Sequence, residues 1–231
     1  MIVLAIDTAT TDLVAGLVEV SGCQPETRSE RVLHTRSHNE LLVPTVQELL
    51  AETGLEFSDL GAVVVGCGPG PFTGLRVGMA TASAFGQALG IPVHGVCTHD
   101  AAAALIDAES ALVVTDARRR EVYWAQYRGG QRVAGPDVVA PAGLHVTAAD
   151  VTGTGLVDVL SVPEHLRDQV VAQADVETAT VTYVAPRPAG LVAVADLNAA
   201  PEPLVPLYLR RPDAKEPAPK PKSPAIPDVV R

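Results

Sequence analysis

Short apolar runs separated by polar turns recur through the first hundred positions and predict β-strands. A continuous run such as residues 62–65, all alanine and valine, is typical of a strand buried on both faces. Five segments have this continuous or alternating character: residues 2–6, 13–20, 31–35, the run around Val63, and 91–96. The first three follow one another across short turns, so we expect them to form a meander.

Two helices are predicted between these strands. The first begins at Ser37, where Ser37-x-x-Glu40 matches a capping box, and continues to about Thr53. Its apolar stripe comprises Leu41, Leu42, Val46, Leu49 and Leu50. Pro44 lies beyond the first turn and is expected to kink this helix. With a second helix over residues 81–89, the order of elements predicts one α/β lobe spanning residues 1–98.

A glycine-rich elbow at residues 66–78 joins a predicted strand to the second helix. Such an elbow is the local geometry that proteins use to bind phosphates. However, no lysine follows the glycines, and Pro69 and Pro71 each remove a backbone N–H donor. We therefore predict that the elbow sets the path of the backbone more than it binds phosphate.

Small residues recur at every fourth position of the second helix, and we call them the small-residue ridge: Gly74, Gly78, Ala82, Gly86 and Gly90. Glycine in a helix interior costs about 1 kcal/mol relative to alanine, so a repeated glycine indicates a close neighbour. That neighbour is either a helix of another protein, which we take as the first interpretation, or the chain's own sheet.

The second half of the chain repeats the opening pattern more weakly. The apolar run at residues 111–116 ends in an aspartate, as residues 3–7 do, and residues 121–127 predict its return strand. After Val138 the pattern degrades. We expect a strand and tight turn at 151–155, and a helix at 189–198. A shortened copy of the first lobe is thus predicted over residues 99–211, followed by a flexible tail at 212–231 with six prolines.

Composition and charge narrow the classes of function. The formal net charge is −10, and about −13 once the basic end from Arg210 onward is set aside, so the body of the chain repels polyanions. Only 3% of residues are aromatic, and the three cysteines have no paired spacing. We expect a cytoplasmic protein without a membrane segment, and a partner that makes most of any contact with nucleic acid.

Three groups of polar residues are candidates for chemistry. Asp7 and Asp116 could form a metal-and-base pair, or each could accept hydrogen bonds from its own turn, which we favour. Arg118, Arg119 and Arg120 could bind phosphate or could simply be solvated. His34 and His38 have an HxxxH spacing, but we expect the first in a strand and the second at a helix start, so no metal site is predicted.

Two lobes that each begin with a strand, an aspartate and a hairpin resemble the actin, sugar-kinase and heat-shock ATPase superfamily. The resemblance implies an actin-like, two-lobe α/β fold in which two hairpin loops grip nucleotide phosphates. Its possible vestigial nucleotide site would comprise Asp7, Thr10, Asp116, Gly153 and Gly155. The arginines that follow Asp116, where glycines are usual, put nucleotide binding in doubt.

The chain also resembles the bacterial TsaB family, also called YeaZ, over nearly its whole length. The resemblance rests on GPGPFTGLRVG at residues 68–78 and on DAR and EVYWA between 116 and 125, with supporting stretches at 4–10, 38–50 and 206–210. It implies a non-catalytic subunit of the machinery that makes threonylcarbamoyladenosine in tRNA.

In that family the partner is a TsaD-like catalytic subunit, joined by a TsaE-like ATPase, and the chains also form homodimers through the same helical face. The resemblance implies that ATP and metal belong to the partner subunits, that this chain holds neither cofactor, and that it meets tRNA only indirectly. The expected partner-binding residues are Leu42, Val46, Leu49, Gly74, Arg76, Gly78 and Ala82. The alternatives are a small actin-like ATPase or phosphotransferase that uses Asp7, and a metallohydrolase.

Overall fold

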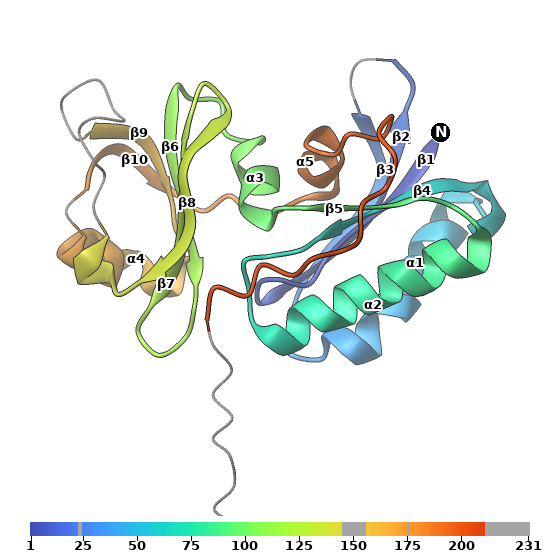
Figure 1. Ribbon diagram of the computed structural model, residues 1–231, viewed down its shortest axis with the longest axis horizontal. Helices are drawn as coiled ribbons and strands as arrows, with labels where there is room; N and C mark the ends of the chain where they lie inside the picture. Colours follow the sequence, from blue (N-terminus) through green and yellow to red (C-terminus); the bar gives the residue numbers. More distant parts are fainter. Residues whose placement is uncertain (23–24, 145–155, 175, 211–231) are drawn as a thin grey trace, which may run out of the picture.

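The computed structural model describes residues 1–22, 25–144, 156–174 and 176–210. Two five-stranded sheets make up two lobes (Figure 1). The first lobe has the strands β1 (Ile2–Asp7), β2 (Asp12–Val20), β3 (Pro25–His34), β4 (Leu60–Gly66) and β5 (Val93–Val96). Strands β1 to β3 pair antiparallel, whereas β4 and β5 continue the sheet in parallel, giving the order β3-β2-β1-β4-β5.

The second lobe repeats the strand arrangement of the first. Its strands are β6 (Ser110–Asp116), β7 (Val122–Arg128), β8 (Gln131–Val139), β9 (Leu156–Ser161) and β10 (Glu177–Thr182). An antiparallel meander again leads to two parallel strands, in the order β8-β7-β6-β9-β10. The predicted copy of the first lobe therefore exists and keeps all five strands. Its one regular α-helix among the described residues is α4 (Glu164–Gln173).

Helices cover both faces of the first sheet. On one face lie α1 (His38–Thr53) and α2 (Phe72–Leu89), which pack with Leu4 and Ile6 of β1 in one core cluster. On the other face lie α3 (Thr98–Ala103) and α5 (Pro188–Ala193) (Figure 1). Gly16 of β2 allows α5 to lie close to the sheet, because a Cβ at this position would overlap the side chain of Pro188 in α5.

The end of the described chain returns to the first lobe. Helix α5 packs on the first sheet, and Leu204 packs against the core that α1 and α2 share. Segments that follow β10 in the sequence thus pack on the first lobe, whereas Ala102 and Ala103 of α3 pack with β6 and β7 of the second. Short 3-10 turns at Phe57–Asp59 and Pro141–Gly143 complete the described elements.

Most local predictions for the first lobe are confirmed, and the differences concern a helix cap and the ends of elements. Ser37 is the N-terminal cap of α1 but makes no side-chain capping bond, so the capping-box prediction is wrong. Helix α1 continues through Pro44. Helix α2 begins at Phe72 instead of residue 81, and α5 ends at Ala193 instead of residue 198. The strand and turn expected at 151–155 lie outside the described residues. Among the described helices, none is long and apolar enough to cross a membrane.

Candidate functional site at the lobe junction and on the helix face

Asp7 ends β1 in the interior of the protein, and each of its carboxylate oxygens accepts a hydrogen bond from the chain itself. One carboxylate oxygen accepts a hydrogen bond from the Ala9 amide at 2.7 Å, and the other accepts one from the Thr98 hydroxyl at 2.7 Å. A Cβ at Gly66 would overlap this carboxylate. Burial raises the pKa of Asp7 to about 6, because desolvation outweighs these two hydrogen bonds. The geometry is that of a buried turn-forming aspartate.

Asp116 ends β6 at the corresponding place in the second lobe. Its Oδ1 accepts a hydrogen bond from the Arg118 amide at 2.6 Å, and its Oδ2 lies 3.4 Å from Nε2 of His165. Thr10 behaves similarly, accepting from the Asp12 amide at 3.1 Å. Both aspartates therefore stabilise their own turns, as the favoured interpretation has it. Gly153 and Gly155, the other members of the candidate nucleotide site, lie outside the described residues.

Side chains of the chain's own later segments bridge the lobe junction. Tyr183, just after β10, donates a hydrogen bond to Oδ2 of Asp12 at 3.0 Å. Burial raises the pKa of the Tyr183 phenol, and the neighbouring Asp12 carboxylate raises it further. Oδ1 of Asp12 lies 3.0 Å from Nδ1 of His34. His34 ends β3 and His38 begins α1, so the two histidines of HxxxH have different surroundings, as predicted.

The segment from Leu204 to Arg210 contacts both lobes, and we call it the junction strap. Its Leu207 amide donates to the Cys67 carbonyl at 2.8 Å in the first lobe. Its Arg210 guanidinium donates to the Ala117 carbonyl at 2.7 Å and pairs with Glu121 at 3.1 Å in the second lobe. Sequence reasoning did not find this role, because a short segment before a proline-rich tail has no periodic pattern to indicate what it packs on.

The junction strap also forms an exposed aromatic cluster with the start of α2. The rings of Phe72 and Tyr208 stack with centroids 5.0 Å apart, and the Arg76 guanidinium lies 3.9 Å from the centroid of Phe72. Arg76 also donates to the Tyr208 hydroxyl at 3.2 Å. Phe72 and Tyr208 remain 44% and 39% exposed. Exposed aromatic and arginine side chains of this kind are typical of the central residues of protein interfaces.

The small-residue ridge of α2 faces the interior of the first lobe. A Cβ at Gly74 or Gly78 would overlap Thr8, whose hydroxyl donates to the Gly74 carbonyl at 2.7 Å. A Cβ at Gly86 would overlap Val93 of β5. Gly90 is the left-handed residue that ends α2, with a φ of 67°. The ridge thus packs on the chain's own sheet, which corrects the first interpretation of a contact with another protein.

The same correction applies to most of the expected partner-binding residues. Six of the seven are buried inside the chain: Leu42, Val46, Leu49, Gly74, Gly78 and Ala82. Only Arg76 is exposed. The sequence period identified the apolar face of α1 and the small-residue ridge of α2, but it could not show what packs on them. A second protein and the chain's own sheet require the same small or apolar residues at such a contact.

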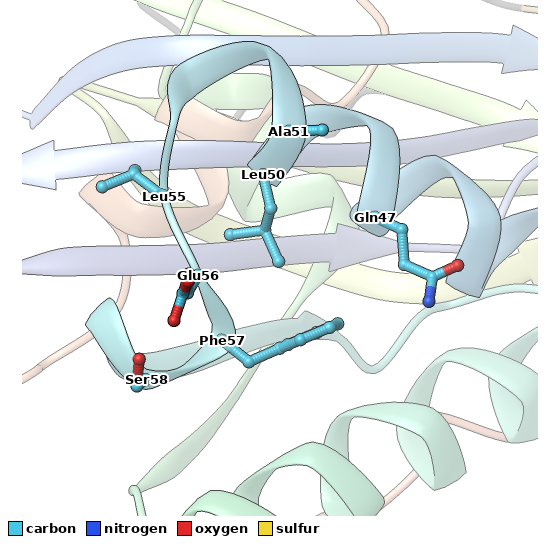
Figure 2. Close-up of a pocket in the computed structure, with 7 residues that line it drawn as sticks. All are labelled: Gln47, Leu50, Ala51, Leu55, Glu56, Phe57 and Ser58. Carbon is cyan, nitrogen blue, oxygen red and sulfur yellow. The ribbon is translucent and has the colours of Figure 1, made fainter.

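The outward side of α2 carries a different set of residues. The exposed positions at every fourth residue are Phe72, Arg76, Ala80 and Ala84. We call these four residues the outer helix face. Beside it, at the C-terminal end of α1, an open hollow of about 430 Å³ is lined mainly by Leu50, Ala51, Leu55 and Phe57. Figure 2 shows Leu50 and Phe57 pointing toward each other across it.

Matching five-stranded sheets, each opened by a strand that ends in an aspartate turn, place the chain in the actin-like class of two-lobed α/β proteins. The family described as "TsaD: tRNA N6-adenosine threonylcarbamoyltransferase" matches residues 25–185. The structure of YeaZ from Pseudomonas aeruginosa superposes with a TM-score of 0.67 at 24% identity, covering 84% of this chain and 89% of that one.

Two sequence relatives complete the comparison. An uncharacterized protein of Mycobacterium leprae is 53% identical over 93% of this chain, which spans only 56% of that protein's length. The tRNA threonylcarbamoyladenosine biosynthesis protein TsaB of Escherichia coli is 34% identical over 55% of each chain. The chain belongs to the family described as TsaD, tRNA N6-adenosine threonylcarbamoyltransferase, and it is similar to proteins named TsaB and YeaZ.

Proposed function

We propose that the chain is a non-catalytic subunit in the biosynthesis of threonylcarbamoyladenosine in tRNA. The observation that carries this proposal is the similarity of the chain to the TsaB protein of E. coli, which is named for this pathway. Asp7 and Asp116 also fit a role in protein binding instead of catalysis. Both carboxylates already accept hydrogen bonds from the chain itself.

The proposed partner is a TsaD-like catalytic subunit. The match of this chain to the TsaD family implies that the two proteins share a fold, so each can present equivalent helices to the other. On this chain the contact is the outer helix face, where Ala80 and Ala84 allow a close approach and Phe72 and Arg76 supply larger side chains. Docking there holds the lobes of the catalytic subunit in a productive arrangement.

The remaining components follow from this assignment. ATP and metal bind in the partner subunits, one of them a TsaE-like ATPase, and the partners make most of the contact with tRNA. Without its partner, the chain forms a homodimer through the same face. Among the described residues no group of three or more histidine, cysteine and acidic side chains is placed to hold a metal. The described contacts of Asp7, with the Ala9 amide and the Thr98 hydroxyl, occupy the carboxylate that the alternative ATPase would use.

Light scattering after gel filtration tests the pairing. The full chain is mixed with the TsaD-like protein of the same organism, and we expect a one-to-one heterodimer in place of any homodimer. Ala84→Arg on the outer helix face should abolish it. Val171→Arg is the matched control, because Val171 is 53% exposed on α4 of the other lobe.

Formation of threonylcarbamoyladenosine on a tRNA transcript by the reconstituted proteins tests the activity. It should require this chain and fail with Ala84→Arg. A wild-type chain that neither binds the TsaD-like protein nor raises its activity would refute the proposal. A heterodimer that survives Ala84→Arg would instead move the contact away from α2.

A further inference from the structure

Helix α2 carries almost no charge, although the protein has a formal net charge of −10. Arg76 is the one charged residue among its 18 residues, and the other exposed positions carry alanine, serine, threonine, glutamine or phenylalanine. By contrast, the neighbouring helix α1 exposes Glu40, Glu48 and Glu52. Depletion of charge around an aromatic residue and an arginine is the composition found at the centre of protein interfaces.

Two aromatic side chains hold Arg76 in place. Its guanidinium lies 3.9 Å from the ring centroid of Phe72, one turn earlier in α2, and its Nε donates to the Tyr208 hydroxyl at 3.2 Å. The rings of Phe72 and Tyr208 stack on each other with centroids 5.0 Å apart. These contacts use one face of the guanidinium and its Nε, so the two terminal nitrogens can still donate to another group.

Arg76 differs in its surroundings from other arginines of the chain. Four arginines on other elements each pair with a glutamate: Arg28, Arg31, Arg167 and Arg210. Within residues 1–22, 25–144, 156–174 and 176–210, no carboxylate lies close enough to Arg76 for such an ion pair. The side chain is thus oriented and exposed, and the described part of this acidic chain does not supply its counter-charge.

We propose that Arg76 binds the carboxylate of an acidic side chain on the TsaD-like subunit, and that Phe72 and Tyr208 position it for this contact. The choice of partner rests on the proposed function. A carboxylate fits because its two oxygens match the two terminal nitrogens of a guanidinium in a bidentate pair. A protein is favoured over a nucleic acid because α2 offers no second cation to a chain of phosphates.

The docking surface therefore extends beyond α2. Tyr208 belongs to the junction strap, and it lies 132 positions from Arg76 in the sequence. The same strap contacts Cys67 of the first lobe through Leu207 and Glu121 of the second lobe through Arg210. The partner thus contacts a surface that α2 and the junction strap build together.

The first test measures the affinity of the heterodimer by titration calorimetry with the full chain and the TsaD-like protein. Arg76→Gln removes the charge and keeps much of the side-chain volume, and we expect it to weaken binding roughly tenfold to a hundredfold. Arg167→Gln is the matched control with the same change in net charge, because Arg167 is exposed on α4 of the other lobe. The control should bind as tightly as the wild type.

Tyr208→Phe tests the positioning. This variant keeps the aromatic stack but removes the hydroxyl that accepts from Arg76. We expect it to weaken the heterodimer roughly two- to tenfold, and to have no further effect once Arg76→Gln is present. A hydroxyl that only stabilised the fold would instead lower the melting temperature and leave the affinity of the heterodimer unchanged.

Chemical cross-linking identifies the group that Arg76 contacts. A carbodiimide joins an amine to a carboxylate only where the two touch, so Arg76→Lys places a reactive amine at the proposed contact. All three natural lysines lie beyond residue 210, which keeps their cross-linked peptides separate in mass spectrometry. We expect Arg76→Lys to form an amide with one acidic residue of the TsaD-like protein, and Arg167→Lys to form none.

The outcomes separate this inference from the proposed function. If Arg76→Gln pairs as tightly as the wild type, the inference is overturned and the heterodimer stands. Cross-links to the partner from both lysine variants, or from neither, would also overturn it. A wild-type chain that forms no heterodimer would refute the proposed function and this inference with it.

Discussion

Replacing Gly78 with alanine should destabilise the protein, although alanine is the better helix former. Gly78 lies in the middle of α2, and a Cβ there would overlap the hydroxyl of Thr8, while Val65 at 3.7 Å would be in ordinary contact. Thr8 cannot move freely, because its hydroxyl donates to the Gly74 carbonyl at 2.7 Å within the buried core. The new methyl group must therefore displace a hydrogen-bonded side chain.

The magnitude follows from three contributions. Overpacking a close contact costs about 1–3 kcal/mol. Disturbing the buried hydrogen bond costs about 1–3 kcal/mol, and the gain in helix propensity returns about 1 kcal/mol. The net loss in the free energy of unfolding is about 1–5 kcal/mol, which lowers the melting temperature of a domain of this size by roughly 2–20 °C.

Denaturant titration of a double-mutant cycle checks the cause of this loss. Thr8→Ala removes the hydroxyl that the new methyl group would strike, so adding Gly78→Ala to it should cost nothing or stabilise by up to about 1 kcal/mol. Ala84→Gly, at an exposed position of the same helix, calibrates the propensity contribution and should cost about 1 kcal/mol. The reasoning is refuted if Gly78→Ala is as stable as the wild type, or if it costs the same with and without Thr8.

Three further predictions follow from the junction and its surroundings. Because burial raises the pKa of Asp7 from 3.8 to about 6, the folded state binds this proton more tightly than the unfolded state, and stability falls as the pH rises from about 4 to 6. Asp7→Asn should flatten that part of the curve and stabilise the protein at neutral pH by roughly 1–3 kcal/mol, as measured by urea unfolding across this range. Arg210→Ala should cost only roughly 0.5–1.5 kcal/mol but speed amide hydrogen exchange over residues 117–121, which mass spectrometry resolves. Burial raises the pKa of Cys67 to about 12 and that of Cys97 to about 11, so iodoacetamide should label both thiols slowly near pH 8 until the protein is unfolded, as site-resolved mass spectrometry would show.

The first lobe could be predicted well from the sequence because its central strands, β1 and β4, are buried on both faces. The runs at residues 2–6 and 62–65 are continuous and apolar, and such a run indicates a buried strand without knowledge of its neighbours. The second lobe was harder to predict. Strands β8 and β10 lie at the edges of their sheet with many exposed residues, and their sequences have little apolar pattern to detect.

The candidate site shows a different limit of sequence reasoning. The four-residue period of glycine and alanine in α2 correctly indicated a close neighbour, but the identity of that neighbour depends on where Thr8 and Val93 lie in three dimensions. The contacts of Tyr183 with Asp12 and of Arg210 with Ala117 join residues 171 and 93 positions apart. No local pattern encodes contacts at such separations.

The contacts at the lobe junction also bear on how this fold is used. An actin-like enzyme that closes around a ligand needs lobes that can move and carboxylates that the ligand can reach. Here Tyr183 and Arg210 tie the lobes together, and the Asp7 carboxylate is bonded to Ala9 and Thr98 in the interior. These ties restrain the lobes from opening, and next to Asp7 the Thr8 hydroxyl holds the start of α2 through its hydrogen bond to the Gly74 carbonyl. A rigid helix face binds a partner at a lower entropic cost than a mobile one, so the same contacts that disfavour a moving cleft favour a docking surface.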